Sequence, residues 1–133
     1  MNILLIGAGY FAQTVYLKCL KDIREVKNVF IFDERKKLSY LVSKSFKFCN
    51  LRDFNSIELK RKKISLAIVC FQREKSYHYC YQLLKNNINV FAEKPIVFSR
   101  KKLKFLIDFA KKRKLVLEVG YQKVFDKNVI FLK

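Results

Sequence analysis

NILLIGAGYFAQ, at residues 2–13, is the stretch that decides the fold. Its first five residues form a short apolar run of the kind that makes a buried strand, and the run ends at Gly7. Apolar residues then recur with helical spacing over residues 10–23, at Phe11, Val15, Cys19 and Ile23. The stretch therefore predicts a strand, a glycine turn and a helix in immediate succession.

The glycine turn has the pattern G-x-G-x-x-A, in which the fixed positions are Gly7, Gly9 and Ala12. Between a strand and a helix this pattern is typical of dinucleotide-binding sites. The first glycine allows a tight turn, the second lets a pyrophosphate approach the backbone, and the small third residue keeps the helix close to the strand. The N–H groups around Tyr10 and Phe11 would then face the phosphates at the positive end of the helix. The alternative is a glycine turn that binds no ligand.

An acidic residue, Asp33, ends the next apolar run, about 20 residues beyond the turn, where a ribose-binding carboxylate belongs. Such a carboxylate accepts hydrogen bonds from the ribose hydroxyls and repels a 2′-phosphate, which favours NAD. Arg35, Lys36 and Lys37 follow at once and could receive that phosphate, so NADP stays open as the cofactor. The alternative role for Asp33 is the N-cap of a helix.

Strands and helices alternate along the rest of the chain. We expect strands at residues 2–6, 28–33, 46–49, 65–71, 88–93 and 115–121. We expect helices at residues 10–23, 35–44, 76–87 and 100–114, the last capped by Ser99, and a turn or two of helix within 53–61. This alternation predicts an α/β fold, a doubly wound parallel sheet of six strands in the Rossmann order 3-2-1-4-5-6.

The chain is strongly basic, with a formal net charge of +18 over 133 residues. This charge indicates either a partner with phosphates, such as a nucleic acid, or a codon bias that favours lysine, and we prefer the second interpretation. Three basic runs, at residues 24–27, 60–63 and 111–114, fall where a helix is predicted to end and a strand to begin. Cations are favoured at helix C-termini, and these turns lie opposite the edge at which such a sheet binds ligands.

Other classes of protein find little support in the composition. No apolar run approaches the ~20 residues of a membrane span, and the N-terminus lacks the basic lead and cleavage site of a signal peptide, so we expect a cytoplasmic protein. A single histidine, His78, makes a Cys/His zinc site improbable, and we expect no metal site. The cysteines form no C-x-x-C pair and are expected to be small buried hydrophobes: Cys19, Cys49, Cys70 and Cys80.

The only proline, Pro95, follows a Glu-Lys pair in the segment NVFAEKPIVFS. Proline locks φ and keeps its predecessor out of helical geometry, so the chain turns sharply there. The segment resembles the Gfo/Idh/MocA family, which comprises glucose–fructose oxidoreductase, inositol dehydrogenase and their relatives. The other stretches that carry the resemblance are NILLIGAGYFAQ, Asp33, SLAIVCF at residues 65–71 and LEVGYQKVFDKNVIFLK at residues 117–133. Together they span nearly the whole chain.

The resemblance implies an oxidoreductase that moves a hydride between a nicotinamide cofactor and a hydroxyl or carbonyl substrate. It places Glu93 by the nicotinamide ribose and makes Lys94 the catalytic residue, which helps to polarise or protonate the sugar oxygen. It assigns Phe71, Gln72 and Gln122 to cofactor binding as well. It also makes the peptide bond before the proline a candidate for the cis form.

The sequence departs from the family pattern after the fourth expected strand. The family usually has Thr-Pro and then a His, whereas these positions are Phe71, Gln72 and Ser76 here. Because His78 is two residues out of register, we interpret it as a helix-surface histidine. An arginine of the family's exit segment is replaced by Val124. These changes could leave cofactor binding intact while weakening substrate handling.

Members of the family carry a second α/β domain that binds substrate and supplies further catalytic residues. We divide this chain into an NAD(P)-binding Rossmann domain at residues 1–122 and an exit segment at residues 123–133. We expect a truncated enzyme or half of a split one, with little or no turnover by itself. The alternatives are a stand-alone dinucleotide-binding regulatory module and, with less support, a basic nucleic-acid-binding protein.

The exit segment carries an apolar tail over residues 124–132. Without a second domain to cover it, this tail would be exposed. We therefore expect either a second-domain polypeptide as a partner or self-association through the apolar residues, which are Phe125, Val129, Ile130, Phe131 and Leu132.

Overall fold

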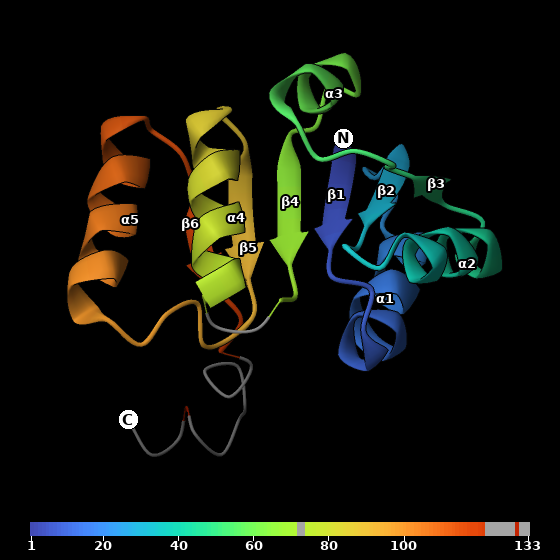
Figure 1. Cartoon of the computed structure of the whole chain (residues 1–133), viewed down its shortest axis with the longest axis horizontal. Helices are drawn as coiled ribbons and strands as arrows, with labels where there is room; N and C mark the ends of the chain where they lie inside the picture. The colour runs from blue at the N-terminus through green and yellow to red at the C-terminus, as the bar shows by residue number, and fades with distance from the viewer. Residues whose placement is uncertain (72–73, 122–129, 131–133) are drawn as a thin grey trace.

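The computed structural model describes residues 1–71, 74–121 and 130. Over this part of the chain, six parallel strands form one sheet in the order β3-β2-β1-β4-β5-β6 (Figure 1). The strands are β1 (Asn2–Ile6), β2 (Asn28–Phe32), β3 (Cys49–Asn50), β4 (Leu66–Val69), β5 (Asn89–Ala92) and β6 (Leu117–Val119). The predicted Rossmann order is confirmed.

Helices cover both faces of the sheet. The helical stretch after β1 consists of a π-helical segment, η1 (Ala12–Tyr16), and α1 (Leu17–Asp22). The others are α2 (Lys36–Phe46), α3 (Ser56–Arg61), α4 (Glu74–Lys85) and α5 (Arg100–Lys112). One core cluster joins α1 and α2 to one face of the sheet, and a second joins α3, α4 and α5 to the other. In Figure 1, α4 and α5 stand over the half of the sheet that contains β4, β5 and β6.

The strands are buried on both faces, which explains their continuous apolar runs. In β1, Leu4 and Ile6 pack into the cluster of α3, α4 and α5, whereas Ile3 and Leu5 pack into the cluster of α1 and α2. All four side chains are at most 2% exposed. This alternation ties β1 to both layers and fixes the point at which the glycine turn leaves the sheet.

An apolar groove lies on the sheet face beside α1. Its volume is about 410 Å³, and its lining includes Tyr16 and Leu20 from the helical stretch and Ile68, Phe91 and Val116 from the sheet side. Among these residues, Val116 is 59% exposed. Part of this face therefore presents apolar side chains to solvent.

The third strand exists, but the bounds predicted for it, residues 46–49, are wrong. Helix α2 continues to Phe46, and the strand β3 is limited to Cys49–Asn50. The helix ends because Lys47 takes a left-handed conformation with φ 58°. The N–H of Phe48 then donates to the carbonyl of Ser43 at 2.8 Å, a Schellman-type closure. The apolar residues there close a helix instead of forming a strand.

The helix predicted at residues 10–23 is confirmed, but its apolar row does not face the core. The side chains of Phe11, Val15 and Ile23 are 41%, 37% and 43% exposed, while Ala12, Leu17 and Leu20 are buried. The π-helical segment carries an extra residue in its turn, which shifts the helical spacing. The same shift helps to explain why Cys19 is exposed, contrary to expectation.

The other cysteines and the last helix match the predictions in part. Cys80 is buried and Cys70 is partly buried, but Cys49 is exposed because it lies in a two-residue edge strand.

The predicted cap of α5 is confirmed, since the side chain of Ser99 accepts a hydrogen bond from Lys102 N at 3.4 Å.

The basic runs lie where they were predicted, at the end of a helix and before the next strand. Residues in the left-handed conformation follow three helices: Lys63 follows α3, Asn87 follows α4 and Lys114 follows α5. Among the helices of the described residues, none combines the length and apolar character needed to cross a membrane. Gln72, Gln122, Val124 and the tail residues other than Ile130 lie outside the described residues, so the expectations about them stay predictions.

Candidate functional site

The glycine turn follows β1 at the carboxyl edge of the sheet. Gly7 has φ 91°, a left-handed value that favours glycine, and its N–H donates to the carbonyl of Phe32 at 2.9 Å. A Cβ atom on Gly7 would lie 3.0 Å from the carbonyl carbon and oxygen of Cys70. Gly7 is therefore required by the packing of the turn against the end of β4.

Gly9 has a different environment. A Cβ atom on it would meet nothing within 4 Å, and its φ lies outside the left-handed range. The described part of the chain therefore gives no steric reason for a glycine at this position. The open space lies at the start of the helical stretch, where the first-turn N–H groups lack partners inside the helix. A phosphate group fits both features, because it needs room near the backbone and N–H donors.

The neighbours of Gly9 divide between solvent and core. Tyr10 is 83% exposed, whereas Ala12 is 1% exposed and packs into the core of α1 and α2, as predicted for the residue that keeps the helix close to the strand. The amide side chain of Gln13 donates to the carbonyl of Ala8 at 2.8 Å, which secures the turn from the helix side.

Asp33 follows β2, and both oxygens of its carboxylate accept hydrogen bonds. Its Oδ1 accepts from the N–H and the Nε of Arg35, both at 2.9 Å, and its Oδ2 accepts from Ala8 N at 2.8 Å and from Arg35 Nη2 at 3.0 Å. The carboxylate is fully buried, and 66% of the Arg35 side chain is exposed. Asp33 does not cap α2, because Arg35 occupies the N-cap position.

Burial and hydrogen bonding act on the Asp33 carboxyl in opposite directions. Burial raises its pKa. The hydrogen bonds from the side chain and backbone of Arg35 and from the backbone of Ala8 lower the pKa by more than burial raises it. The net result is a pKa below the ordinary value. The pKa of Arg35 is raised by its hydrogen bond to Asp33. The pair is therefore ionised at neutral pH.

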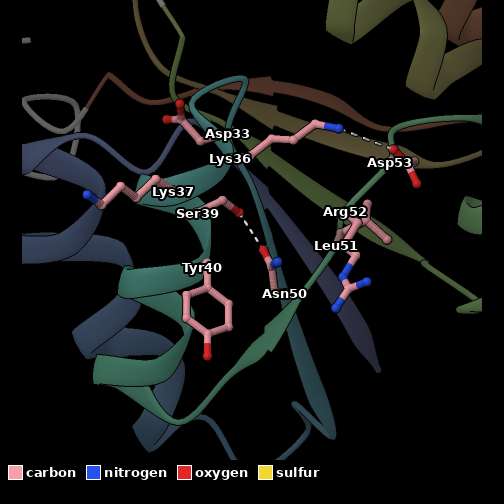
Figure 2. Close-up of a pocket in the computed structure, with 9 residues that line it drawn as sticks. All are labelled: Asp33, Lys36, Lys37, Ser39, Tyr40, Asn50, Leu51, Arg52 and Asp53. Atoms are coloured by element: carbon pink, nitrogen blue, oxygen red, sulfur yellow. Dashed lines mark hydrogen bonds and ion pairs between the residues drawn. The ribbon is translucent and has the colours of Figure 1, made fainter.

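A pocket of about 390 Å³ opens beside Asp33, between α2 and the end of β3 (Figure 2). Ser39 Oγ donates to Asn50 Oδ1 at 2.6 Å and links the two walls. Lys36 reaches towards Asp53, with 3.9 Å between the ammonium and the carboxylate. The remaining lining residues are Lys37, Tyr40, Leu51 and Arg52. Three of the lining side chains are cationic, so the pocket suits an anionic ligand.

The Glu-Lys-Pro segment follows β5, at the same edge of the sheet as the glycine turn. The register pairs Ile6 with Val69, and Val69 with Ala92, so Gly7, Cys70 and Glu93 leave the sheet side by side. The Lys94–Pro95 peptide bond is cis, as predicted.

Glu93 is held by contacts that the sequence does not reveal. The hydroxyl of Tyr16 donates to Glu93 Oε1, and Lys94 N approaches Glu93 Oε2 at 3.3 Å. Gly120 lies behind the carboxylate, since a Cβ atom there would be 3.0 Å from Glu93 Oε1. Burial, and then the hydrogen bond to Glu93, raises the pKa of Tyr16. Tyr16 is therefore a neutral donor at neutral pH.

Sequence patterns had not singled out Tyr16. The π-helical segment η1 ends at this residue, and such segments are frequent at functional sites. Cys70 lies nearby, and burial, aided by the negative charge of Glu93, raises the pKa of its thiol to about 12. Cys70 is thus an unreactive thiol. Beside it, the phenol of Tyr16 donates its hydrogen bond to Glu93, and the side chain of Lys94 is exposed.

The end of β4 carries aromatic packing where the family pattern has Thr-Pro. The ring of Phe71 stacks on Tyr79, with centroids 5.1 Å apart. Ser76 is buried and its hydroxyl donates to the carbonyl of Phe71, while His78 is exposed, as predicted. Residue 72 lies outside the described part of the chain.

The loop after β2 is also fastened to α4. Glu34 accepts from Lys75 and, at 3.2 Å, from the hydroxyl of Tyr79. Among the described residues, no three potential metal ligands lie close enough together to hold an ion.

A known family model matches most of this chain. The model of the oxidoreductase family with an NAD-binding Rossmann fold, Gfo/Idh/MocA, matches residues 1–121. No curated protein matches the sequence.

Solved structures share the fold over most of this chain. The 3-ketoreductase KijD10 from Actinomadura kijaniata, in complex with NADP and TDP-benzene, has a TM-score of 0.88 and 17% identity and matches 99% of this chain and 40% of its own. UDP-N-acetylglucosamine 3-dehydrogenase GnnA from Acidithiobacillus ferrooxidans has a TM-score of 0.84 and 18% identity, with coverages of 99% and 42%. GenD2 from gentamicin A biosynthesis, in complex with NAD, has a TM-score of 0.82 and 19% identity, with coverages of 90% and 34%. The chain thus spans 34–42% of the length of these proteins.

Proposed function

We propose the function of this chain from one established premise, which is that it belongs to the Gfo/Idh/MocA oxidoreductase family and has that family's NAD-binding Rossmann fold. The proposal is that it binds a nicotinamide dinucleotide across the carboxyl edge of its sheet, as the cofactor domain of a sugar- or cyclitol-type oxidoreductase. The observation that carries it is the open space over Gly9 at the start of the helical stretch. The bound cofactor would supply hydride transfer to or from a hydroxyl or carbonyl carbon.

The residues at this edge would bind successive parts of the dinucleotide. Gly9 gives the pyrophosphate access to the backbone, and the N–H groups of Tyr10 and Phe11 donate to it. The loop formed by Asp33 and Arg35 receives the adenosine ribose. The ring of Phe71, which is partly exposed, adds an apolar contact between the two ends of the site.

Glu93 and Lys94 would act at the nicotinamide end. Tyr16 and Gly120 hold the carboxylate of Glu93 at the edge of the sheet, where it can accept hydrogen bonds from the nicotinamide ribose. Lys94 is exposed and directly follows Glu93, so its ammonium can donate a proton or hydrogen bond to a substrate oxygen.

The rest of the substrate site would come from additional polypeptide. The structural neighbours are 34–42% covered by this chain, which supports a second domain or partner that completes the enzyme. The apolar groove beside α1 is a surface on which such a polypeptide could pack. If no such polypeptide is present, we expect the chain to self-associate, and light scattering at increasing protein concentration measures this.

A cytoplasmic location is consistent with four free cysteines, because reduced thiols are typical of that compartment.

A calorimetric titration with NADH and NADPH tests the proposal. We expect saturable binding by the wild-type chain and none by Gly9→Asp, which places bulk and negative charge where the phosphates would lie. The matched control is Asn87→Asp, because it adds the same charge to an exposed turn at the opposite edge of the sheet. Absence of binding, or equal losses in both variants, would contradict the proposal.

A further inference from the structure

The hydrogen-bonding capacity of the Asp33 carboxylate is already used within the chain. A carboxylate has about four acceptor sites, and four donors reach Asp33: Ala8 N and the N, Nε and Nη2 of Arg35. Its side chain is 0% exposed. A ribose hydroxyl could bind Asp33 only after displacing Arg35. In the state that the structure shows, the carboxylate positions Arg35 instead of presenting itself to a nucleotide.

The pairing of Asp33 with Arg35 also removes the charge repulsion by which an acidic residue disfavours a 2′-phosphate. Repulsion requires an uncompensated negative charge near the ribose. Here the guanidinium forms two parallel hydrogen bonds to the carboxylate, at 2.9 and 3.0 Å, so the pair has no net charge. The buried member is the anion and the exposed member is the cation.

Arg35 keeps donors for a ligand. A guanidinium carries five N–H donors, and Asp33 occupies Nε and one donor of Nη2. Both donors of Nη1 and the second donor of Nη2 have no partner among the described residues. These donors lie on the exposed part of the side chain, and a planar fork of this kind matches the oxygens of a phosphate.

The pocket next to the pair adds positive charge. Lys36, Lys37 and Arg52 line it, and Asp53 compensates Lys36 only across an exposed contact of 3.9 Å. The hydroxyl of Ser39 and the amide of Asn50 lie between the two walls, as Figure 2 shows. A volume of about 390 Å³ falls within the range of ~300–1,000 Å³ that is usual for small-ligand sites.

We propose that Arg35, held by Asp33, determines cofactor choice and makes the chain prefer NADP(H), or any adenosine nucleotide with a 2′-phosphate, over NAD(H). This inference rests on the proposed dinucleotide function. It reverses the preference that the sequence alone suggests for an acidic residue at the end of the second strand. The lysines and Arg52 of the pocket strengthen the field at the phosphate, and Arg35 supplies the directed hydrogen bonds.

The experiment compares 2′,5′-ADP with 5′-ADP, because both carry two phosphates and only the first carries one at the 2′ position. Calorimetry on the wild-type chain should give at least about tenfold tighter binding of 2′,5′-ADP, which is what one charge-assisted hydrogen bond supplies. Arg35→Gln should lose this ratio, mainly because its affinity for 2′,5′-ADP falls. The matched control Arg61→Gln removes an exposed arginine that pairs with Glu58 at 2.8 Å and should keep the ratio.

Arg35→Gln leaves the buried negative charge of Asp33 without its cation, and this could prevent the chain from folding. A second variant avoids this problem. Arg35→Lys keeps a cation for Asp33 but loses the fork, so the ratio should fall towards unity in a folded protein. Equal or tighter binding of 5′-ADP by the wild-type chain, or the same loss in Arg61→Gln, would overturn the assignment of Arg35. If 5′-ADP binds and Gly9→Asp abolishes that binding, the dinucleotide function stands although the preference is refuted. If neither nucleotide binds, both proposals fail.

Discussion

Tyr16 donates a hydrogen bond to Glu93 and so joins the end of the π-helical segment to the end of β5. The two residues are 77 positions apart in the chain. The contact fastens the glycine-turn side of the site to the Glu-Lys-Pro side. It also orients the carboxylate that directly precedes the proposed catalytic lysine.

Tyr16→Phe removes this donor without changing the shape of the side chain. A hydrogen bond to a carboxylate contributes roughly 1.5–3 kcal/mol, so we expect the free energy of unfolding to fall by about that amount. Urea denaturation measures it. Tyr10→Phe is the control, because Tyr10 is 83% exposed, and it should have no effect. Equal stabilities for the two variants would show that the Tyr16 hydrogen bond contributes nothing.

The two glycines of the turn should differ in what they do. Gly7→Ala places a Cβ 3.0 Å from the backbone of Cys70 in a left-handed conformation, so it should destabilise the chain by about 1–3 kcal/mol. Gly9→Ala meets nothing within 4 Å and should unfold like the wild-type chain. Thermal or urea unfolding compares them. If Gly9→Ala is the more destabilised variant, the assignment of one glycine to packing and the other to the ligand is wrong.

The four thiols should react in two groups. Cys19 and Cys49 are exposed, whereas burial raises the pKa of Cys70 and of Cys80 to about 12. Since the thiolate is the reactive form, a disulfide reagent at pH 8 should modify two thiols quickly and two slowly. Cys19→Ser should lower the fast count by one. A single rate for all four thiols would contradict the burial of the second pair.

The Asp33–Arg35 pair should make stability depend on pH. The pKa of Asp33 is below its ordinary value in the folded chain, so the unfolded chain binds the proton more readily on acidification. The pair therefore stabilises the fold above about pH 4, near the ordinary pKa of an aspartate, and this contribution is lost as the pH falls through the lower folded value. Asp33→Asn removes the contribution.

Unfolding by urea at neutral pH and near pH 3 measures this effect. The difference in stability between the wild-type chain and Asp33→Asn should be large at neutral pH and should shrink in acid. Asp108→Asn, an exposed substitution on α5, should show no such difference. A difference between the wild-type chain and Asp33→Asn that stays constant with pH would mean that the charge of Asp33 does not stabilise the fold.

Much of the fold could be predicted from the sequence because its signals are local. Apolar runs and helical spacing predicted the strand order, and the family resemblance of the segment around the lone proline predicted the cis bond at Lys94–Pro95. The glycine turn needed only a strand before it and a helix after it. In each case the information lies within a few neighbouring residues.

The errors arose where conformations or distant contacts decide the outcome. Lys47 takes a left-handed conformation that ends α2, so the third strand begins at Cys49 and not at the predicted residue 46. The π-helical segment moved the apolar row of the first helix away from the core. The contact of Tyr16 with Glu93 depends on the folded sheet, and no periodicity reveals it. For the same reason the sequence predicted that Asp33 lies at the end of the second strand, but not the four hydrogen bonds that occupy its carboxylate.

The central claim is that a dinucleotide binds across the carboxyl edge of the sheet with its phosphates at Gly9. The most direct test is to follow backbone amide resonances of the isotope-labelled chain by NMR during titration with NADPH. We predict that the amides of Gly9, Tyr10 and Phe11 shift most, with further shifts at Glu93 and Lys94, and that Gly9→Asp abolishes all of them. Shifts confined to the basic turns at residues 60–63 and 111–114, on the opposite edge, would contradict the claim and would indicate non-specific attraction of phosphates by the net charge of +18.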